Sequence, residues 1–161
     1  ALHPSGTAPV ITDGAVVLAE TGAVVDYIVA KHGGGRLTIP ASDPAFADFL
    51  YWYHFSNGSL IPAMMAMAGD GGLAPIMRDR VERYIAALEA HLAKGKPWLV
   101  GDSFTVADIM ILFPLTTMRA FIPVDLTDCP AIRAYIRRLV DRPAFQRAKA
   151  KADPDLVLPI D

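Results

Sequence analysis

The sequence predicts an α+β fragment, a strand hairpin and one helix, followed by an all-helical region. Two short apolar stretches flank Asp13-Gly14 within residues 7–21, which is a strong hairpin signal. A glycine-rich stretch separates this part from the rest, and no segment after Ser42 has a convincing strand pattern. These observations divide the chain into three parts. They are residues 1–33 with the hairpin and its helix, a linker at 34–41, and an all-helical domain at 42–161.

The hairpin is followed directly by a helix. Apolar residues at helical spacing predict this helix from Glu20 to Lys31, and Gly33 ends it as a C-terminal cap. Two strands cannot bury the hydrophobic face of the hairpin. We therefore expect the remaining strands of its sheet to precede Ala1, where the chain lacks an initiating methionine.

The helical domain is predicted to begin at Ser42, a good N-cap with Asp43 in its first turn. This long helix passes Asn57-Gly58 and is expected to kink at Pro62. The next helix is predicted from Ile76 to Lys94. On this helix, Glu89 lies off the apolar stripe and is assigned to a solvated face. Further helices are predicted from near Thr105, Pro130 and Pro143.

Composition excludes several classes of function. The net charge of −2 and pI of about 6.1 give no basis for binding nucleic acid or an anionic membrane. The longest apolar run, Ile109 to Leu115, is too short to span a bilayer. One cysteine, Cys129, suits a reducing, cytoplasmic compartment. Its place at a helix start could lower the pKa of its thiol, although a structural role is the simpler interpretation. The four histidines have no metal-binding spacing, so we predict no metal.

The stretch GDSFTVADI (residues 101–109) predicts a capped, central helix. Thr105 and Asp108 have the N-cap and N3 spacing of a capping box, in which each side chain accepts from the other residue's backbone N–H. The apolar residues that follow predict a buried helix, so loss of the cap should cost about 1–2 kcal/mol. We interpret Asp108 as structural.

The opening stretch carries the candidate binding residues. Pro9 belongs at a strand edge or at the first residue of a strand, because it lacks a backbone donor. A cis bond there would present the backbone of Val10 sideways, free to pair with an extended ligand. Glu20 and Thr21 open the next helix, where free amides and the positive end of the dipole favour a carboxylate. Plain helix capping is the simpler interpretation of these two residues.

Taken together, these stretches resemble the bacterial type of the glutathione S-transferase superfamily. The resemblance includes HPSGTAPVI, LAETGAVVDYI, KPWLVGDSFTVADI and RPAFQRA, and covers nearly the whole chain. It implies part of a thioredoxin-like domain, followed by the helical bundle of this superfamily. It also implies that Pro9 is cis, that Val10 pairs with the cysteinyl part of glutathione, and that Glu20 and Thr21 hold the γ-glutamyl end.

The resemblance implies glutathione as co-substrate and conjugation of its thiolate to an electrophilic small molecule. The Tyr, Ser or Cys that activates the thiol is expected upstream of Ala1, so the catalytic residue is not assigned. The helix with the aromatic run would line the electrophile site, with Tyr53, Asn57 and Met64 as candidates, although core packing is the simpler interpretation of all three. Two copies are expected to pair through that helix and the helix from Ile76.

Other activities stay open at this point. The same fold could serve as a non-catalytic glutathione-fold interaction module. It could also carry a glutathione-dependent isomerase, dehalogenase or disulfide reductase, because a fold does not determine the reaction.

Overall fold

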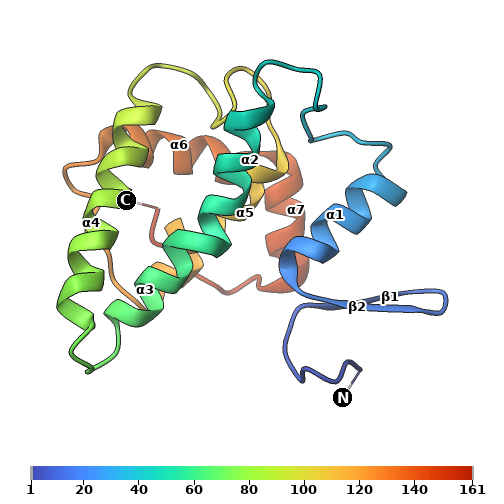
Figure 1. Ribbon diagram of the computed structural model, residues 1–161, viewed down its shortest axis with the longest axis horizontal. Coiled ribbons are helices and arrows are strands. Elements are labelled where there is room, and N and C mark those ends of the chain that lie inside the picture. Colours follow the sequence, from blue (N-terminus) through green and yellow to red (C-terminus); the bar gives the residue numbers. More distant parts are fainter. Residues whose placement is uncertain (1, 161) are drawn as a thin grey trace.

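The computed structural model describes residues 2–160 (Figure 1). The predicted fold class is confirmed: a two-stranded hairpin and one helix lie at one end, and a helical bundle forms the rest. The first part contains β1 (Val10–Asp13), β2 (Val16–Ala19) and α1 (Thr21–Lys31). The second part contains α2 (Phe46–Phe55), η1 (Ser56–Leu60), α3 (Ile61–Met67), α4 (Ala74–Leu92), α5 (Val106–Leu115), η2 (Thr117–Ala120), α6 (Pro130–Val140) and α7 (Pro143–Ala152).

The hairpin and α1 form a single small unit. The strands are antiparallel, and Val10 lies opposite Ala19. Gly14 in the turn has a φ of 59°, which a glycine adopts freely. At the far end of α1, the N–H of Gly35 donates to the carbonyl of Val29. A Cβ on Gly33 would lie 2.7 Å from that same carbonyl oxygen, so the close turn after the helix requires glycine there.

The start of the long helix differs from the prediction. Ser42 is not its N-cap, because α2 begins at Phe46 and Ala45 occupies the cap position. The carboxylate of Asp43 instead accepts from the backbone N–H of Ala45 at 2.8 Å. This bond closes a tight turn over the residues that the sequence had suggested for the first helical turn.

The irregularity in the long helix lies one turn before Pro62. Residues Ser56–Leu60 form a π-helical turn, in which the N–H of Ile61 donates to the carbonyl of Ser56. Pro62 has no N–H for the carbonyl of Gly58, and its ring would collide with that group in a regular helix. The disturbance therefore falls in the turn before the proline, as a widened turn between α2 and α3.

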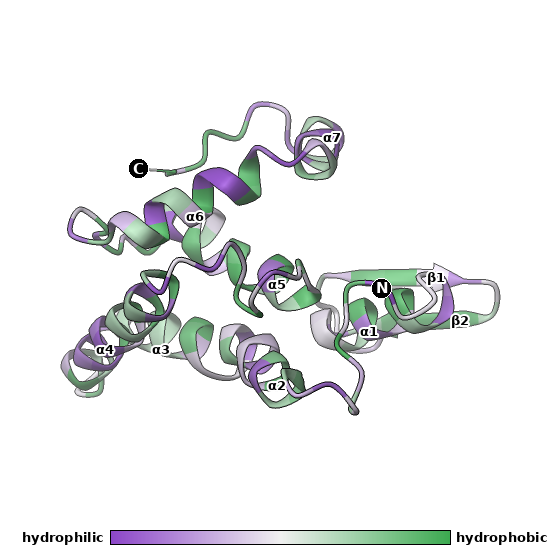
Figure 2. Ribbon diagram, turned by 90° about the horizontal axis from the view of Figure 1, so that it is seen from above, coloured by the Kyte–Doolittle hydropathy of each residue, from purple (hydrophilic) through white to green (hydrophobic). Residues whose placement is uncertain are grey.

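Helix α5 is the centre of the bundle. It contacts α2, η1, η2 and α6, and Figure 2 shows it between the α2–α3 side and the α6–α7 side. The predicted capping box is present, and the Asp108 carboxylate, 0% exposed, also accepts from the Leu99 N–H and the Tyr135 hydroxyl. Burial and the nearby Asp108 carboxylate raise the pKa of the Tyr135 phenol. Asp108 therefore joins three segments, which confirms its structural interpretation.

Glu89 was assigned to a solvated face, and this was wrong. Its two carboxylate oxygens accept from the backbone N–H groups of Ala131 and Ile132, at 2.9 and 2.8 Å. These donors are orphan amides in the first turn of α6, so Glu89 caps that helix from α4. A pattern along one helix could not indicate a partner 42 residues away.

Candidate functional site

The hairpin register brings the four predicted binding residues together. Val10 lies directly opposite Ala19, which is the residue before Glu20. Pro9 precedes Val10 and follows a cis Ala8–Pro9 bond, as the resemblance implied. Thr21 is the first residue of α1. One end of β1 therefore lies beside the start of the helix.

The backbone of Val10 lies at the end of β1, directly after the cis Ala8–Pro9 bond. The sheet of the described residues contains only β1 and β2, so one edge of β1 has no strand partner within residues 2–160. Backbone groups next to a cis-proline bond can pair with a ligand that has its own amide groups.

Glu20 has an unusual backbone conformation. Its φ is 79° and its ψ is 117°, a region that residues with a side chain rarely adopt. Its side chain is exposed and makes no capping hydrogen bond to the helix. Ordinary N-capping therefore does not account for this residue. Strained residues of this kind concentrate at ligand sites, where the strain orients a side chain or a backbone group.

The first turn of α1 supplies hydrogen-bond donors next to the carboxylate of Glu20. The amides of Thr21, Gly22 and Ala23 stand at the positive end of an 11-residue helix, where intrahelical acceptors are absent. These donors suit a carboxylate, while the exposed Glu20 carboxylate suits an ammonium group. A ligand that ends in a free amino acid, with its α-ammonium and α-carboxylate, carries both of these groups. The adjoining β1 edge suits the peptide bonds that continue from it.

Tyr53 holds α1 against the helical domain. Its hydroxyl lies 2.7 Å from the carboxylate of Asp26 and 3.1 Å from the carbonyl of Gly22, both in α1. Burial, and then the Asp26 carboxylate, raise the pKa of the Tyr53 phenol. Sequence reasoning placed Tyr53 on the electrophile side and missed this contact, because nothing local relates residues 27 positions apart.

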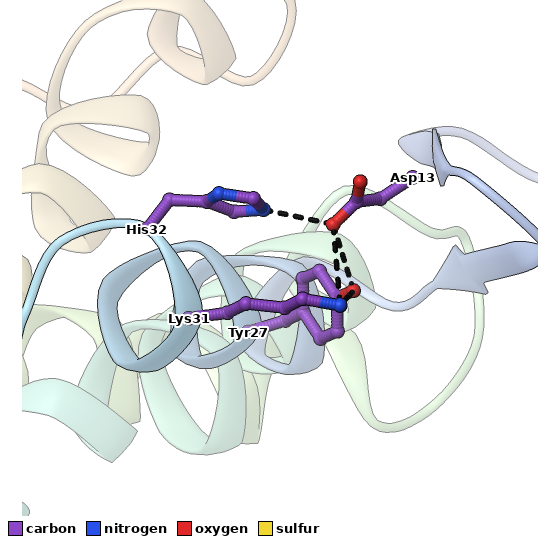
Figure 3. Close-up of polar contacts among 4 residues, drawn as sticks. All are labelled: Asp13, Tyr27, Lys31 and His32. Atoms are coloured by element: carbon purple, nitrogen blue, oxygen red, sulfur yellow. Dashed lines mark hydrogen bonds and ion pairs between the residues drawn. The ribbon is translucent and has the colours of Figure 1, made fainter.

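A polar cluster fixes the other end of the hairpin to α1 (Figure 3). The Asp13 carboxylate accepts from the Tyr27 hydroxyl at 2.9 Å, and the Nε2 atom of His32 lies 2.8 Å away. Lys31 Nζ lies 3.5 Å from the same oxygen. These bonds from Tyr27 and His32 lower the pKa of Asp13. The spacing of Tyr27 and Lys31, four residues apart on one helix face, was the only local signal of this cluster.

The three residues proposed for the second substrate differ in their exposure to solvent. Met64 is 1% exposed and Tyr53 is 6% exposed, so both belong to the core of this structure. Asn57 is half-buried in the π-helical turn. Only Asn57 of the three combines a polar side chain with access to solvent.

Cys129 does not have the lowered pKa that its position suggested. Burial is the main cause that raises the pKa of its thiol, followed by the carboxylates of Glu89, Asp128 and Asp125. Within residues 2–160, no three His, Cys, Asp or Glu side chains are grouped so that they could hold a metal ion. No helix of this part of the chain is long and apolar enough to cross a membrane.

Comparison with known proteins identifies the family of this chain. Residues 51–143 match the family described as glutathione S-transferase, C-terminal domain. Glutathione S-transferase 3 of Zea mays is 32% identical, over 93% of this chain and 73% of the maize protein. This chain belongs to the glutathione S-transferase family. Glutathione S-transferase GstB of Escherichia coli K12 is 30% identical, over 91% of this chain and 75% of that protein.

Solved glutathione S-transferases share the fold. The enzyme from Actinobacillus pleuropneumoniae has a TM-score of 0.81 and 31% identity, over 94% of this chain and 72% of that one. A sphingomonad glutathione S-transferase complexed with glutathione has a TM-score of 0.78 and 26% identity, over 96% and 78% of the two chains. These likenesses include the hairpin and α1 as well as the helical domain.

Proposed function

We propose that the protein is a glutathione transferase that joins the thiolate of glutathione to an electrophilic small molecule. The observation that carries this proposal is the strained, uncapped Glu20, which lies beside Val10 and the cis Ala8–Pro9 bond. Family membership supports it, as does the similar sphingomonad protein, which is described as complexed with glutathione.

In this proposal the γ-glutamyl end of glutathione lies at the start of α1. The Glu20 carboxylate accepts from its ammonium group, and the Thr21 hydroxyl and the first-turn amides donate to its carboxylate. The cysteinyl part pairs with the backbone of Val10 at the β1 edge, next to Pro9. Glutathione is the co-substrate, and the proposal includes no metal.

The chemical step is nucleophilic attack by sulfur. The thiol of bound glutathione gives its proton to solvent or a base, and the thiolate forms a carbon–sulfur bond with the electrophile. The electron pair of the broken bond leaves with the departing group, or is protonated after addition to a double bond. We place the group that stabilises the thiolate outside residues 1–161. Asn57 is the residue of this chain that we assign to the electrophile side.

Glutathione affinity of the Glu20→Gln variant tests the proposal. The substitution removes a charge without changing side-chain size, and we expect binding about tenfold or more weaker, since charge-assisted bonds are the strong ones. Glu82→Gln, an exposed position on α4, is the matched control and should leave the affinity unchanged. Titration calorimetry of the whole protein measures both. If Glu20→Gln and the wild type bind glutathione with equal affinity, this binding mode is wrong.

The activity itself needs a separate assay. Retention on immobilised glutathione, together with turnover of a general electrophile such as 1-chloro-2,4-dinitrobenzene, supports the transferase. Retention without turnover of any electrophile indicates a binding module instead. The residue that faces the glutathione sulfur then decides between conjugation by Tyr or Ser and thiol exchange by Cys.

We also propose that two copies pair through α2 and α4. Tyr51 is 56% exposed, and an apolar groove of about 570 Å³ lies beside it, between α2, η1 and Tyr84 of α4. A large exposed aromatic beside a groove is typical of a symmetric interface. Light scattering at micromolar concentration should report a dimer, and Tyr51→Glu should convert it to a monomer. A wild-type monomer would contradict the pairing.

A further inference from the structure

A second groove lies at the end of the helical domain opposite the hairpin. It runs between α4 and the segment 121–129 that connects η2 to α6, and its volume is about 680 Å³. Figures 1 and 2 both show α4 at one end of the molecule and β1 and β2 at the other. The volume is within the range typical of small-molecule sites. The groove lies on a different side of α4 from the one that Tyr84 shares with Tyr51.

The floor of this groove is apolar. Val81 and Ile85 of α4 contribute buried side chains, and Pro123 and Val124 line the opposite wall. Ala86 also lines the groove and is exposed, so the groove is open to solvent at this residue. An apolar lining of this kind favours a hydrophobic ligand body.

The polar lining has one dominant sign of charge. Four carboxylates line the groove, those of Glu82, Glu89, Asp125 and Asp128, against the guanidinium of Arg78 in the lining and that of Arg119 close to Asp125. Glu89 is engaged by the α6 amides, and Asp125 accepts from the N–H and hydroxyl of Thr127. Bonds from neutral donors do not cancel the negative charge, so the groove keeps a negative potential.

Cys129 lines the same groove and responds to that potential. Besides burial, the carboxylates of Glu89, Asp128 and Asp125 raise the pKa of its thiol, and only Arg119 acts in the opposite direction. Burial disfavours a charge of either sign, whereas the three carboxylates disfavour an anion and favour a cation.

We infer that this groove binds a hydrophobic organic cation, with its apolar body against Val81 and Ile85 and its charge facing Glu82 and Asp128. The class includes quaternary ammonium and phosphonium compounds with aromatic or aliphatic groups. The inference is independent of the proposed glutathione site, so either can fail while the other stands.

The test uses two ions of the same shape and opposite charge. Titration calorimetry of the whole protein compares tetraphenylphosphonium with tetraphenylborate at low ionic strength. We expect the phosphonium to bind at least about tenfold more tightly, and the difference to shrink as salt is added. Equal affinity for the two ions would mean that the carboxylates do not favour the cation over the anion. If neither ion binds, the groove is not a ligand-binding site. Either result overturns the inference.

Variants locate the binding. Ala86→Phe fills the groove and should abolish phosphonium binding, while Ala87→Phe, an exposed neighbour outside the lining, should not. The double variant Glu82→Gln, Asp128→Asn keeps the shape and should weaken phosphonium binding about fivefold or more. Bound phosphonium should also slow alkylation of Cys129, the only cysteine.

Two further results would overturn the inference. Undiminished phosphonium binding by Ala86→Phe would place the site elsewhere. A change of oligomeric state in Ala86→Phe, but not in Ala87→Phe, would mean that a second copy of the chain covers the groove. The far-ultraviolet circular dichroism spectrum and the thermal unfolding curve of every variant confirm that each one is folded.

Discussion

Helices α5 and α1 both begin with unpaired backbone N–H groups, but the residues at the two helix starts treat these groups in opposite ways. At α5, Thr105 is extended, with a φ of −130°, and the side chains of Thr105 and Asp108 satisfy the local donors while 1% and 0% exposed. At α1, Glu20 has a φ of 79°, and its side chain is exposed and makes no capping bond. The buried terminus has its polar groups paired, as burial demands. At the exposed terminus, the Glu20 side chain makes no capping bond to the helix.

The largest expected effect is at the buried terminus. Asp108→Ala should destabilise the fold by about 3–5 kcal/mol, because it leaves several buried donors without an acceptor. This exceeds the 1–2 kcal/mol expected from a cap alone, since Leu99 and Tyr135 also donate to Asp108. Urea denaturation measures the loss, with Asp102→Ala as control, because Asp102 is exposed. A loss no larger than that of the control would refute the central role of Asp108.

The next effect concerns the contact between the two regions. Tyr53→Phe removes the hydroxyl that joins α2 to Asp26 in α1, and should cost about 1–1.5 kcal/mol of stability. Glutathione affinity should fall with it, because α1 is less firmly held, while the KM for the electrophile stays unchanged. A raised KM for the electrophile, at unchanged stability, would restore Tyr53 to the substrate site.

The exposed terminus should respond in the opposite direction. Glu20→Gly relieves the strain of a φ of 79°, and should stabilise the protein by about 1 kcal/mol after the added flexibility of glycine is subtracted. Glutathione binding should weaken in the same variant. Thermal and chemical denaturation give the first quantity and calorimetry the second. A destabilised Glu20→Gly variant would show that the conformation is not strained.

The smallest effect is at the hairpin turn and depends on pH. The pKa of Asp13 is lowered from 3.8 by bonds from Tyr27 and His32. Its contribution is therefore complete above pH 3.8 and is lost as the pH falls through the lower pKa of the folded protein. Asp13→Asn should lower the melting temperature slightly near pH 7, and the difference should close in acid. A difference that stays constant across this range would assign the effect to shape rather than charge.

The features that sequence predicted well are local ones. The Asp13-Gly14 turn, the Thr105–Asp108 capping box and the end of α1 before the glycines all depend on residues a few positions apart. Their geometry is fixed by backbone chemistry that the sequence displays directly. The clustering of Pro9 and Val10 with Glu20 and Thr21 follows from the hairpin register, and so it too could be anticipated.

The features that sequence missed join distant segments. Glu89 caps α6 across 42 residues, and Tyr53 reaches Asp26 across 27. Each looked like an ordinary surface or aromatic residue of its own helix, because the partner is set by how the helices pack. The late start of α2 has a different cause, since the carboxylate of Asp43 closes a turn onto the N–H of Ala45 directly before the helix.

The bond from Glu89 to α6 also has a dynamic consequence. Amides at a helix start normally exchange with solvent through fraying, yet those of Ala131 and Ile132 are held by a side chain of another helix. Their hydrogen exchange should follow the opening of α4 rather than the local unwinding of α6. In Glu89→Gln these two amides should lose protection first, while the middle of α6 keeps its own.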